Sequence, residues 1–295
     1  MQVHENRVAT VGRSTVSRAL PQRGRRTIGA WCFLDHFGPS EPDAADGLAV
    51  GPHPHCGLAT VTWLIRGSGV HTDSLGSEQL IEPGQLNLMT AGHGIAHAEQ
   101  TPAERCGQLH GVQFWVAQPE VTRHGPPAFE HHGELPMIGV GPFGATVLLG
   151  SFGGVASPAR TDTEIVGVEF TGSQSSTAEI GLDPAYEHGI VVLEGRLGLD
   201  GATAEDPVIV KPASMVYLDR GTPSLRVEVD GPTRWMLVGG EPFEAPLQMW
   251  WNFVGRTRDE MTAAVTQWND GDDRFGVVNS GLERIAAPTP VQSAT

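Results

Sequence analysis

The sequence predicts an all-β protein of two tandem β-barrels or sandwiches, with one short helix near the C-terminus. The first observation behind this prediction is composition: 38 glycines and 22 prolines occur among 295 residues, which is typical of many tight turns between short strands. The second is a weak internal repeat, because similar patterns recur 128 residues apart, as at Trp63 and Val191. A repeated β unit indicates two copies of one fold.

Strands are expected where β-branched and aromatic residues gather between turns. The run at 60–66, TVTWLIR, is followed by glycines at 67 and 69, which is a strand-then-turn signal. The tight turn Glu82-Pro83-Gly84 separates two further runs. The other strands predicted in this half of the chain cover 79–81, 85–90, 112–116 and 146–152. Many short strands at such spacing indicate a sandwich or a barrel.

The repeat sets the predicted division of the chain into domains. The pattern from 81 to 92, a tight turn followed by a strand and a glycine, resembles the pattern from 210 to 221. We therefore predict a first β domain over residues 1–155. A second β domain is predicted over residues 156–295, and it includes the C-terminal helix and a short tail.

The helix prediction depends on a capping signal near the C-terminus. Thr257 and Glu260 have the spacing of a capping box, in which the threonine side chain accepts from a backbone N–H of the first turn. Apolar residues then follow at helical spacing, namely Met261, Ala264, Val265 and Trp268. We expect this stripe to pack onto one of the β domains.

Two short pairs of residues indicate a metal site in the first domain. His53 and His55 are two positions apart, and so are His97 and Glu99. Side chains at i and i+2 of a strand point to the same face, so each pair can offer two donors to one point. Three imidazoles and one carboxylate are good ligands for a divalent transition metal. These four residues are therefore the predicted metal ligands.

The second copy of the repeat lacks this ligand set. The offset places other residues at the positions that correspond to the four ligands, in order Gly181, Asp183, Arg226 and Glu228. His188 is a histidine of the second domain, but it has no partner two positions away. We therefore expect the chemistry in the first domain and a structural or partner-binding role for the second.

Charge and composition exclude several classes of function. The 19 basic and 34 acidic residues give a net charge of −15, and such a surface repels nucleic-acid phosphates. No apolar run reaches the roughly 18 residues of a membrane span, and the N-terminus has no signal-peptide pattern. Three cysteines form no disulfide framework. We expect a cytoplasmic monomer that binds neither nucleic acid nor membranes.

The segment 52–99 resembles the signature of the pirin family, in the bicupin branch of the cupins. It contains, in order, HPH, TVTWL, H-x-DSLG, I-x-PG and MTAG-x-GI-x-H-x-E. Gly-Glu-Pro-Phe at 240–243 resembles the second domain of the same family. The resemblance implies two cupin barrels, and it implies metal ligands at His53, His55, His97 and Glu99.

Two positions depart from the family pattern. Cys56 and Ala59 occupy places where the family usually has an arginine and a glutamate. The loss of both charges removes an expected ion pair near the site. Cys56 is one residue from a predicted ligand, so in a strand it faces away from the metal. We expect Cys56 to be a buried structural thiol.

The resemblance implies a function of dioxygenase type. Some pirins are similar to quercetinases, which open a flavonol ring with dioxygen. By that analogy Glu99 serves both as metal ligand and as proton acceptor for a small aromatic substrate such as a flavonol. The expected metal is Fe2+, although Mn2+, Ni2+, Cu2+ or Zn2+ accept the same ligands. Candidates for the walls of the substrate site are Phe33, Trp63, Met89, Phe114 and Trp115.

Two other functions use the same residues. Other pirins resemble regulators that bind a partner protein in a metal-dependent way, so a non-catalytic regulatory protein is the alternative. A purely structural metal is the third interpretation, in which four ligands close a tetrahedral zinc site. The sequence names neither the metal nor the physiological substrate.

Overall fold

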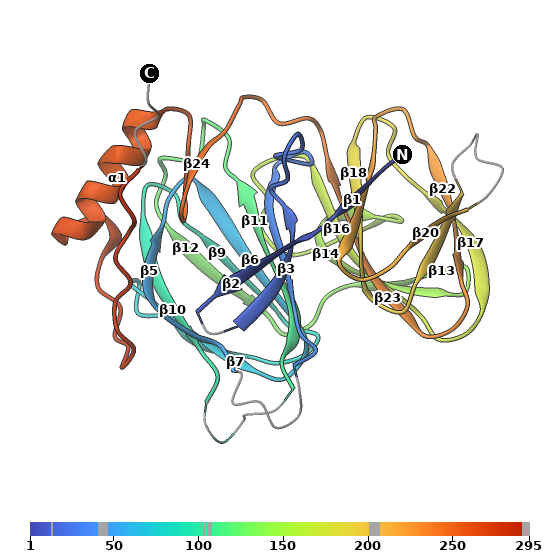
Figure 1. Cartoon of the computed structure of the whole chain (residues 1–295), viewed down its shortest axis with the longest axis horizontal. Helices are drawn as coiled ribbons and strands as arrows, with labels where there is room; N and C mark the ends of the chain where they lie inside the picture. The colour runs from blue at the N-terminus through green and yellow to red at the C-terminus, as the bar shows by residue number, and fades with distance from the viewer. Residues whose placement is uncertain (13, 41–46, 103, 105–107, 201–206, 291–295) are drawn as a thin grey trace. The chain divides into compact units, whose positions relative to one another are not determined.

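The computed structural model describes residues 1–12, 14–40, 47–102, 104, 108–200 and 207–290. Strands dominate these ranges, together with the α-helix α1 (Arg258–Asp270) and a short 3-10 helix, η2 (Asp273–Phe275) (Figure 1). The prediction of an all-β fold with a short C-terminal helix is confirmed. Within the described ranges no helix is long and apolar enough to cross a membrane.

The chain forms two compact units that differ from the predicted linear domains. Unit I is defined by Met1–Ala9, Val16–His36 and His132–Phe243. Unit II is defined by Thr10–Thr15, Phe37–His131 and Glu244–Thr295. A division at residue 155 would assign the C-terminal helix to the second domain, whereas the helix belongs to the unit that contains the predicted ligands. The cause is packing, because the apolar stripe of the helix covers strands of unit II.

Unit II is built from two antiparallel sheets. Their orders are β5-β10-β7-β8 and β12-β9-β6-β11 (Figure 1). The strands and their bounds are β5 (Ala49–His55), β6 (Leu58–Arg66), β7 (Gly69–Asp73), β8 (Glu78–Ile81), β9 (Leu86–Thr90), β10 (Ile95–Gln100), β11 (His110–Ala117) and β12 (Ala128–His132, whose last residue falls in unit I). The hairpin of β24 (Gln248–Trp250) and β25 (Phe253–Gly255) precedes α1.

Unit I contains two sheets whose central strands follow the same order as the corresponding strands of unit II. The larger follows β1-β21-β18-β23-β16-β14-β13, and the smaller follows β17-β22-β19-β20. The bounds are β1 (Gln2–Glu5), β13 (Met137–Val140), β14 (Phe143–Phe152), β16 (Ile165–Gly172), β17 (Ser176–Gly181), β18 (Glu187–Glu194), β19 (Leu197–Asp200), β20 (Val208–Val210), β21 (Ser214–Leu218), β22 (Ser224–Val229) and β23 (Thr233–Gly240). β15 (Val155–Ala156) pairs with β14, and β4 (Trp31–Phe37, whose last residue falls in unit II) belongs to neither of these sheets. Two strands cross the boundary between the units, β2 (Arg7–Val11) and β3 (Ser14–Leu20).

The internal repeat is real, but the predicted alignment of one pair is wrong. β17 pairs with β22, where Glu179 lies opposite Arg226 and Gly181 lies opposite Ser224. Glu179 and Gly181 therefore occupy the places of the first histidine pair, instead of the predicted Gly181 and Asp183. The connection from β17 to β18 is longer than that from β5 to β6, which shifts the offset. The conclusion is unchanged, because neither residue is an imidazole.

Large apolar side chains fill the interior of unit I. Phe170 and Trp235 stack with ring centroids 5.1 Å apart and an interplanar angle of 5°. Phe143 meets the same tryptophan edge-on. These rings belong to one buried cluster that includes Val168, Val192, Leu199 and Val227 among its other members. Among the described residues, the buried cluster of this interior consists of apolar side chains.

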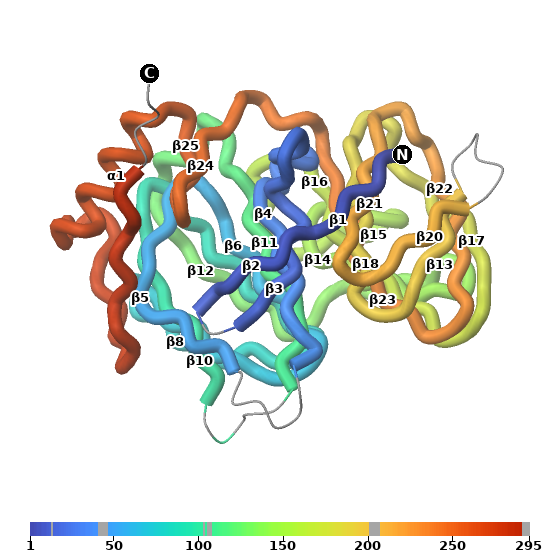
Figure 2. Tube along the Cα trace, viewed as in Figure 1, coloured from blue at the N-terminus to red at the C-terminus, as the bar shows by residue number. Residues whose placement is uncertain are grey.

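The C-terminal helix begins and ends at the signals that its sequence carries. The Thr257 hydroxyl accepts from the backbone N–H of Glu260 at 3.2 Å, and Gly271 ends the helix with φ of 76°. Met261, Ala264, Val265 and Trp268 are its buried residues. They pack with Cys56 and Ala96 of unit II in one apolar cluster. The segment after the helix runs beside β5, where Ile285 N–H donates to Pro52 O at 2.9 Å (Figure 2).

Candidate metal centre

Adjacent strands bring the two predicted ligand pairs together. β5 and β10 are antiparallel neighbours, and His53 lies directly opposite His97. His55 follows two residues later on β5, on the same face. The register shifts between His97 and Glu99, so one strand is bulged at this point and Glu99 has no ligand histidine across from it.

The three histidines form a buried cluster. One nitrogen of each ring lies within 4.8 Å of the others. His53, His55 and His97 are 6%, 2% and 1% exposed. The ring centroids of His53 and His97 are only 4.3 Å apart. Three imidazoles this close and this buried form a donor set that can hold a divalent transition metal.

Hydrogen bonds fix which nitrogen of two histidines faces the cluster. His53 Nδ1 lies 2.8 Å from Gly51 O, and His55 Nδ1 lies 3.0 Å from Asn252 O. A carbonyl oxygen only accepts, so both Nδ1 atoms carry the proton and both Nε2 atoms carry a lone pair. Outer acceptors of this kind orient metal-binding histidines in proteins.

The remaining geometry also fits a metal. His55 Nε2 lies 3.1 Å from His97 Nε2. Two lone pairs at this distance repel unless a proton or a cation lies between them. Two nitrogens bound at right angles to a metal, each about 2.1 Å from it, are separated by about 3.0 Å. The spacing of these two nitrogens therefore fits two ligands of one metal ion.

Glu99 lies near the cluster without joining it. Its Oε1 accepts from Gln113 Nε2 at 2.9 Å, and its side chain is buried, with 7% of the residue exposed. Burial raises the pKa of Glu99, and the hydrogen bond from Gln113 opposes that rise. Among the described residues the group of mutually close donors contains the three histidines and not this carboxylate. The role of Glu99 as fourth ligand stays a prediction.

A third pair with the same spacing lies beside the cluster and escapes the sequence analysis. His71 and Asp73 are on β7, where Asp73 lies opposite His97 and His71 lies opposite Glu99. His71 Nε2 is 3.0 Å from Asp73 Oδ2, and His71 Nδ1 is 3.3 Å from His97 Nδ1. The signal was available, because the segment reads His-x-Asp within a predicted β domain. The same two residues begin the H-x-DSLG element of the family signature.

Burial lowers the pKa of all three histidines of the cluster. The pKa of His53 falls to about 4, and those of His55 and His97 fall well below 6.5. Neighbouring histidines add to the effect, whereas the carbonyl oxygens that accept from His53 and His55 oppose it. The imidazoles are therefore neutral at neutral pH, which is the form that binds metal.

Acid should destabilise the metal-free protein. An unfolded histidine takes up a proton near pH 6.5, whereas folded His53 resists protonation until about pH 4. Between these values the unfolded chain binds more protons, so stability is complete above pH 6.5 and is lost as the pH falls toward 4. For His53 alone the loss in the free energy of unfolding is about 3 kcal/mol. This loss is measured by urea unfolding of the protein at pH 7.5 and at pH 4.5, after a chelator has removed any metal.

A neutral replacement provides the control for the acid effect. His53→Gln removes the titrating ring and should reduce the difference in unfolding free energy between the two pH values. His93 is exposed, so His93→Gln should retain the wild-type pH dependence. An unchanged pH dependence in His53→Gln would contradict the argument.

One face of β6, β9 and β11 lies toward the histidine cluster. The ring centroid of Trp115 is 5.2 Å from that of His55, and Gln113, two residues away on β11, contacts Glu99. Met89 shares this face, because it and Trp115 pair with the same residue of β6. Met89 and Trp115 are therefore the two candidates whose register suits a substrate wall.

The other three candidates lie elsewhere. Trp63 pairs with Val112, and Phe114 pairs with Val61, which places all four on the opposite face of the sheet. Phe33 belongs to unit I. There the guanidinium carbon of Arg18 lies 4.4 Å from its ring centroid. Strand alternation excludes Trp63 and Phe114 from the face that carries Trp115.

Cys56 is a buried structural thiol, as its strand position predicts. It packs in the apolar cluster under α1, and burial raises the pKa of its thiol to about 11. A thiol with so high a pKa is a poor nucleophile and a poor metal ligand at neutral pH. A concavity of about 360 Å³ beside it includes His93 and Arg274.

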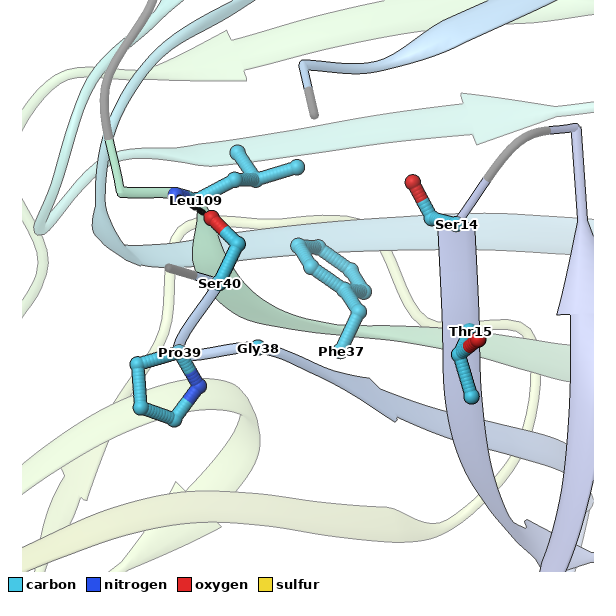
Figure 3. A pocket seen from close by; sticks show the side chains of 7 residues that line it. All are labelled: Ser14, Thr15, Phe37, Gly38, Pro39, Ser40 and Leu109. Carbon is cyan, nitrogen blue, oxygen red and sulfur yellow. Dashed lines mark hydrogen bonds between the residues drawn. The ribbon is translucent and has the colours of Figure 1, made fainter. Parts of the chain in front are cut away.

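A separate surface pocket of unit II is lined, among the described residues, by side chains that do not ionise. Its volume is about 290 Å³ and its lining consists of Ser14, Thr15, Phe37, Gly38, Pro39, Ser40 and Leu109 (Figure 3). Figure 3 shows the Phe37 ring between the strand of Ser14 and the segment of Ser40. The described lining shares no residue with the histidine cluster, and none of its seven residues is an acid, a base or a metal ligand.

Two barrels with the same strand order, one of which buries a cluster of three histidines, define a protein of the cupin class. The chain belongs to the pirin family within this class: the family model "Pirin" matches residues 13–116, and the model "Pirin C-terminal cupin domain" matches residues 167–276. This confirms the family that the signature at 52–99 indicates.

Three similar proteins illustrate the relationship. The Pseudomonas aeruginosa protein named "Putative quercetin 2,3-dioxygenase PA1205" is 45% identical over 286 residues, which cover 96% of this chain and 88% of that protein. A "Pirin-like protein" of Caulobacter vibrioides is 33% identical over 283 residues, which cover 91% of this chain and 93% of that protein. A crystal structure of quercetin 2,3-dioxygenase from Acinetobacter baumannii superimposes on this chain with a TM-score of 0.94. The two sequences are 43% identical, and the match covers 100% of this chain and 97% of the other.

Proposed function

We propose that this protein is a metal-dependent dioxygenase of the pirin type, which opens a flavonol ring with dioxygen. The observation that carries the proposal is the buried cluster of His53, His55 and His97, whose nitrogens converge within 4.8 Å. A buried carboxylate, Glu99, lies two residues beyond His97 on the same face. The quercetin 2,3-dioxygenase names of two similar proteins support the choice of substrate class.

The proposed site holds one divalent transition metal. His53, His55 and His97 would bind it through Nε2, and Glu99 would complete the set as the fourth ligand. We propose Fe2+, while Mn2+, Ni2+, Cu2+ and Zn2+ accept the same donors. The metal would supply Lewis acidity and, for the redox-active ions, one-electron chemistry with dioxygen.

Glu99 would take the proton from the flavonol 3-hydroxyl. In the metal-free protein burial raises the pKa of Glu99, and its ionised carboxylate is the form that accepts a proton. Hydrogen bonds with Gln113 Nε2 and with the Thr62 side chain hold the carboxylate in place beside the cluster. Met89 and Trp115 would contact the flat ring system of the flavonol, because apolar and aromatic side chains line such sites.

Glu99→Gln should reduce oxygen uptake by a factor of about 100 or more, since it removes a general base. The measurement is flavonol-dependent oxygen consumption with quercetin, by protein loaded separately with Fe2+, Mn2+, Ni2+ or Cu2+. One molecule of dioxygen should be consumed per flavonol. Glu78→Gln is the matched control, because Glu78 is exposed on β8 of the same sheet, and its uptake should equal that of the wild type.

Two results would contradict this function. The first is wild-type uptake in Glu99→Gln, which would remove the carboxylate from the reaction. The second is quercetin loss that proceeds without dioxygen, or the absence of uptake with all four metals despite stoichiometric loading. The second result would favour the regulatory alternative described next.

One contact favours a second candidate, a non-catalytic regulator that binds a partner protein. His55 Nδ1 contacts the backbone oxygen of Asn252 in the β24–β25 hairpin. The neighbouring Trp250 and Trp251 are only partly buried, so a metal bound at His55 could influence a surface that carries two tryptophans. A specific partner that is captured by the metal-loaded protein and released by a chelator would support this candidate. The expected monomeric state and cytoplasmic location stay predictions.

A further inference from the structure

Three side chains beside the cluster form a continuous line of polar contacts. Asp73 Oδ2 lies 3.0 Å from His71 Nε2, and His71 Nδ1 lies 3.3 Å from His97 Nδ1. All three residues are buried, with exposures of 2%, 6% and 1% in that order. The β7–β10 register brings them to one face, because Asp73 pairs with His97. The line ends at His97 Nε2, the atom that faces the cluster.

Only one arrangement of the protons along this line leaves His97 Nε2 without a proton and able to bind a metal. Asp73 Oδ1 accepts from the backbone N–H groups of Leu75 and Ser77, at 2.9 and 3.0 Å. The carboxylate is thus an acceptor, and His71 Nε2 must donate to it. With its proton on Nε2, the His71 ring can accept at Nδ1. His97 Nδ1 donates into that lone pair, and its Nε2 is left free of a proton.

The opposite arrangement would disable the ligand. If His71 carried its proton on Nδ1, His97 Nδ1 would have to accept, and the proton of His97 would move to Nε2. That N–H would point at His55 Nε2, 3.1 Å away, and His97 could not bind a metal. The tautomer of His71 therefore decides whether His97 is a ligand.

Stacking holds His71 in the orientation that this line requires. The ring of Phe129 lies parallel to it, with centroids 4.3 Å apart and an interplanar angle of 12°. The side chain is thus held by a carboxylate at one nitrogen, by His97 at the other and by an aromatic face. A residue fixed from three sides is prepared before a metal arrives, as preorganised sites require.

We propose that His71 and Asp73 are positioning residues that select the metal-binding tautomer of His97. The proposal rests on the proposed metal site and deepens it, since it concerns the affinity of that site. Neither residue contacts the reacting atoms; both act through His97. Removal of an outer hydrogen-bond partner of a histidine ligand weakens metal binding by about 10- to 100-fold, and this is the loss expected here.

Asp73→Asn tests the tautomer with little change in shape. The asparagine Oδ1 can still accept from the two backbone N–H groups of the following turn, so the turn is retained. Its NH2 group faces His71 Nε2 and donates, which forces His71 to carry its proton on Nδ1. We expect the dissociation constant for Zn2+, measured on the full chain by competition with a chromophoric chelator, to rise about 10- to 100-fold.

Two replacements of His71 separate positioning from packing. His71→Leu fills space but cannot accept from His97, so the affinity for Zn2+ should fall by a similar factor. His71→Gln retains an acceptor oxygen and should recover most of the affinity. His93→Ala, at an exposed histidine, should bind Zn2+ as the wild type does. Thermal unfolding and circular dichroism of each variant verify that it is folded.

A spectroscopic readout tests the tautomer directly. In the zinc-loaded, 15N-labelled wild type, long-range proton–nitrogen correlations should show His97 with a proton on Nδ1 and His71 with a proton on Nε2. Wild-type affinity in both Asp73→Asn and His71→Leu would overturn the proposal, and so would a proton on His71 Nδ1 in the wild type. These measurements use neither quercetin nor dioxygen. A failed dioxygenase assay therefore leaves the proposal standing, whereas wild-type protein that binds no Zn2+ overturns it together with the site.

Discussion

His97→Ala is expected to abolish stoichiometric metal binding. His97 is the most buried member of the cluster, at 1% exposure, and its ring is within 4.3 Å of His53 and 5.0 Å of His55, centroid to centroid. Its removal leaves two imidazoles that face each other across a gap. Loss of a direct ligand should weaken binding by more than the roughly 100-fold limit for losing an outer partner.

The measurement is metal content after dialysis, together with titration calorimetry of the apo protein. His93→Ala is the matched control, because His93 lies in the turn before the same strand but is exposed and contacts Gly125 O. It should retain one metal per chain. One tightly bound metal per chain in His97→Ala would mean that the ligand set is different from the one proposed, and the dioxygenase mechanism would lose its foundation.

Trp268→Ala is expected to reduce the free energy of unfolding by about 3 to 5 kcal/mol, the range for large aromatic residues in cores. Trp268 is 3% exposed and meets Phe275 edge-on at 5.8 Å. The guanidinium of Arg284 stacks on its other side at 3.5 Å, and its Nε1 donates to Ile285 O at 2.8 Å. The substitution leaves a cavity and releases the segment that lies against β5.

Urea denaturation monitored by circular dichroism measures this loss. Trp268→Phe is the matched control, because it retains most of the apolar volume and loses the N–H donor. Its destabilisation should be less than half that of Trp268→Ala. Equal stability of the alanine variant and the wild type would mean that the C-terminal segment contributes nothing to the folding of unit II.

Local sequence patterns predict those features of this protein that depend on residues only a few positions apart. The i,i+2 spacing of His53 and His55 places both on one face of a strand, and the capping box at Thr257 marks the start of the helix. Each signal lies within a few residues, so the backbone geometry alone gives it meaning. The internal repeat then predicts the second β domain, and the family signature identifies both domains as cupin barrels.

Long-range pairing explains what the sequence could not predict. The register shift that separates His97 from Glu99 depends on the partner strand β5, and the place of His71 depends on β7 lying next to β10. Asn252 is far from His55 in the chain, yet its carbonyl oxygen orients that ring. The place of α1 in unit II likewise depends on its packing against residues far away in the sequence, such as Cys56 and Ala96.

The contact between His55 and Asn252 has a consequence for biosynthesis. A ribosome makes the histidine early, but the carbonyl that holds its Nδ1 proton follows almost 200 residues later, at a sequence separation of 197. A nascent chain that already contains the whole β5–β12 barrel still lacks this acceptor. The acceptor that orients His55 is therefore absent until residue 252 has been made, so the outer contacts of the cluster are completed late in synthesis.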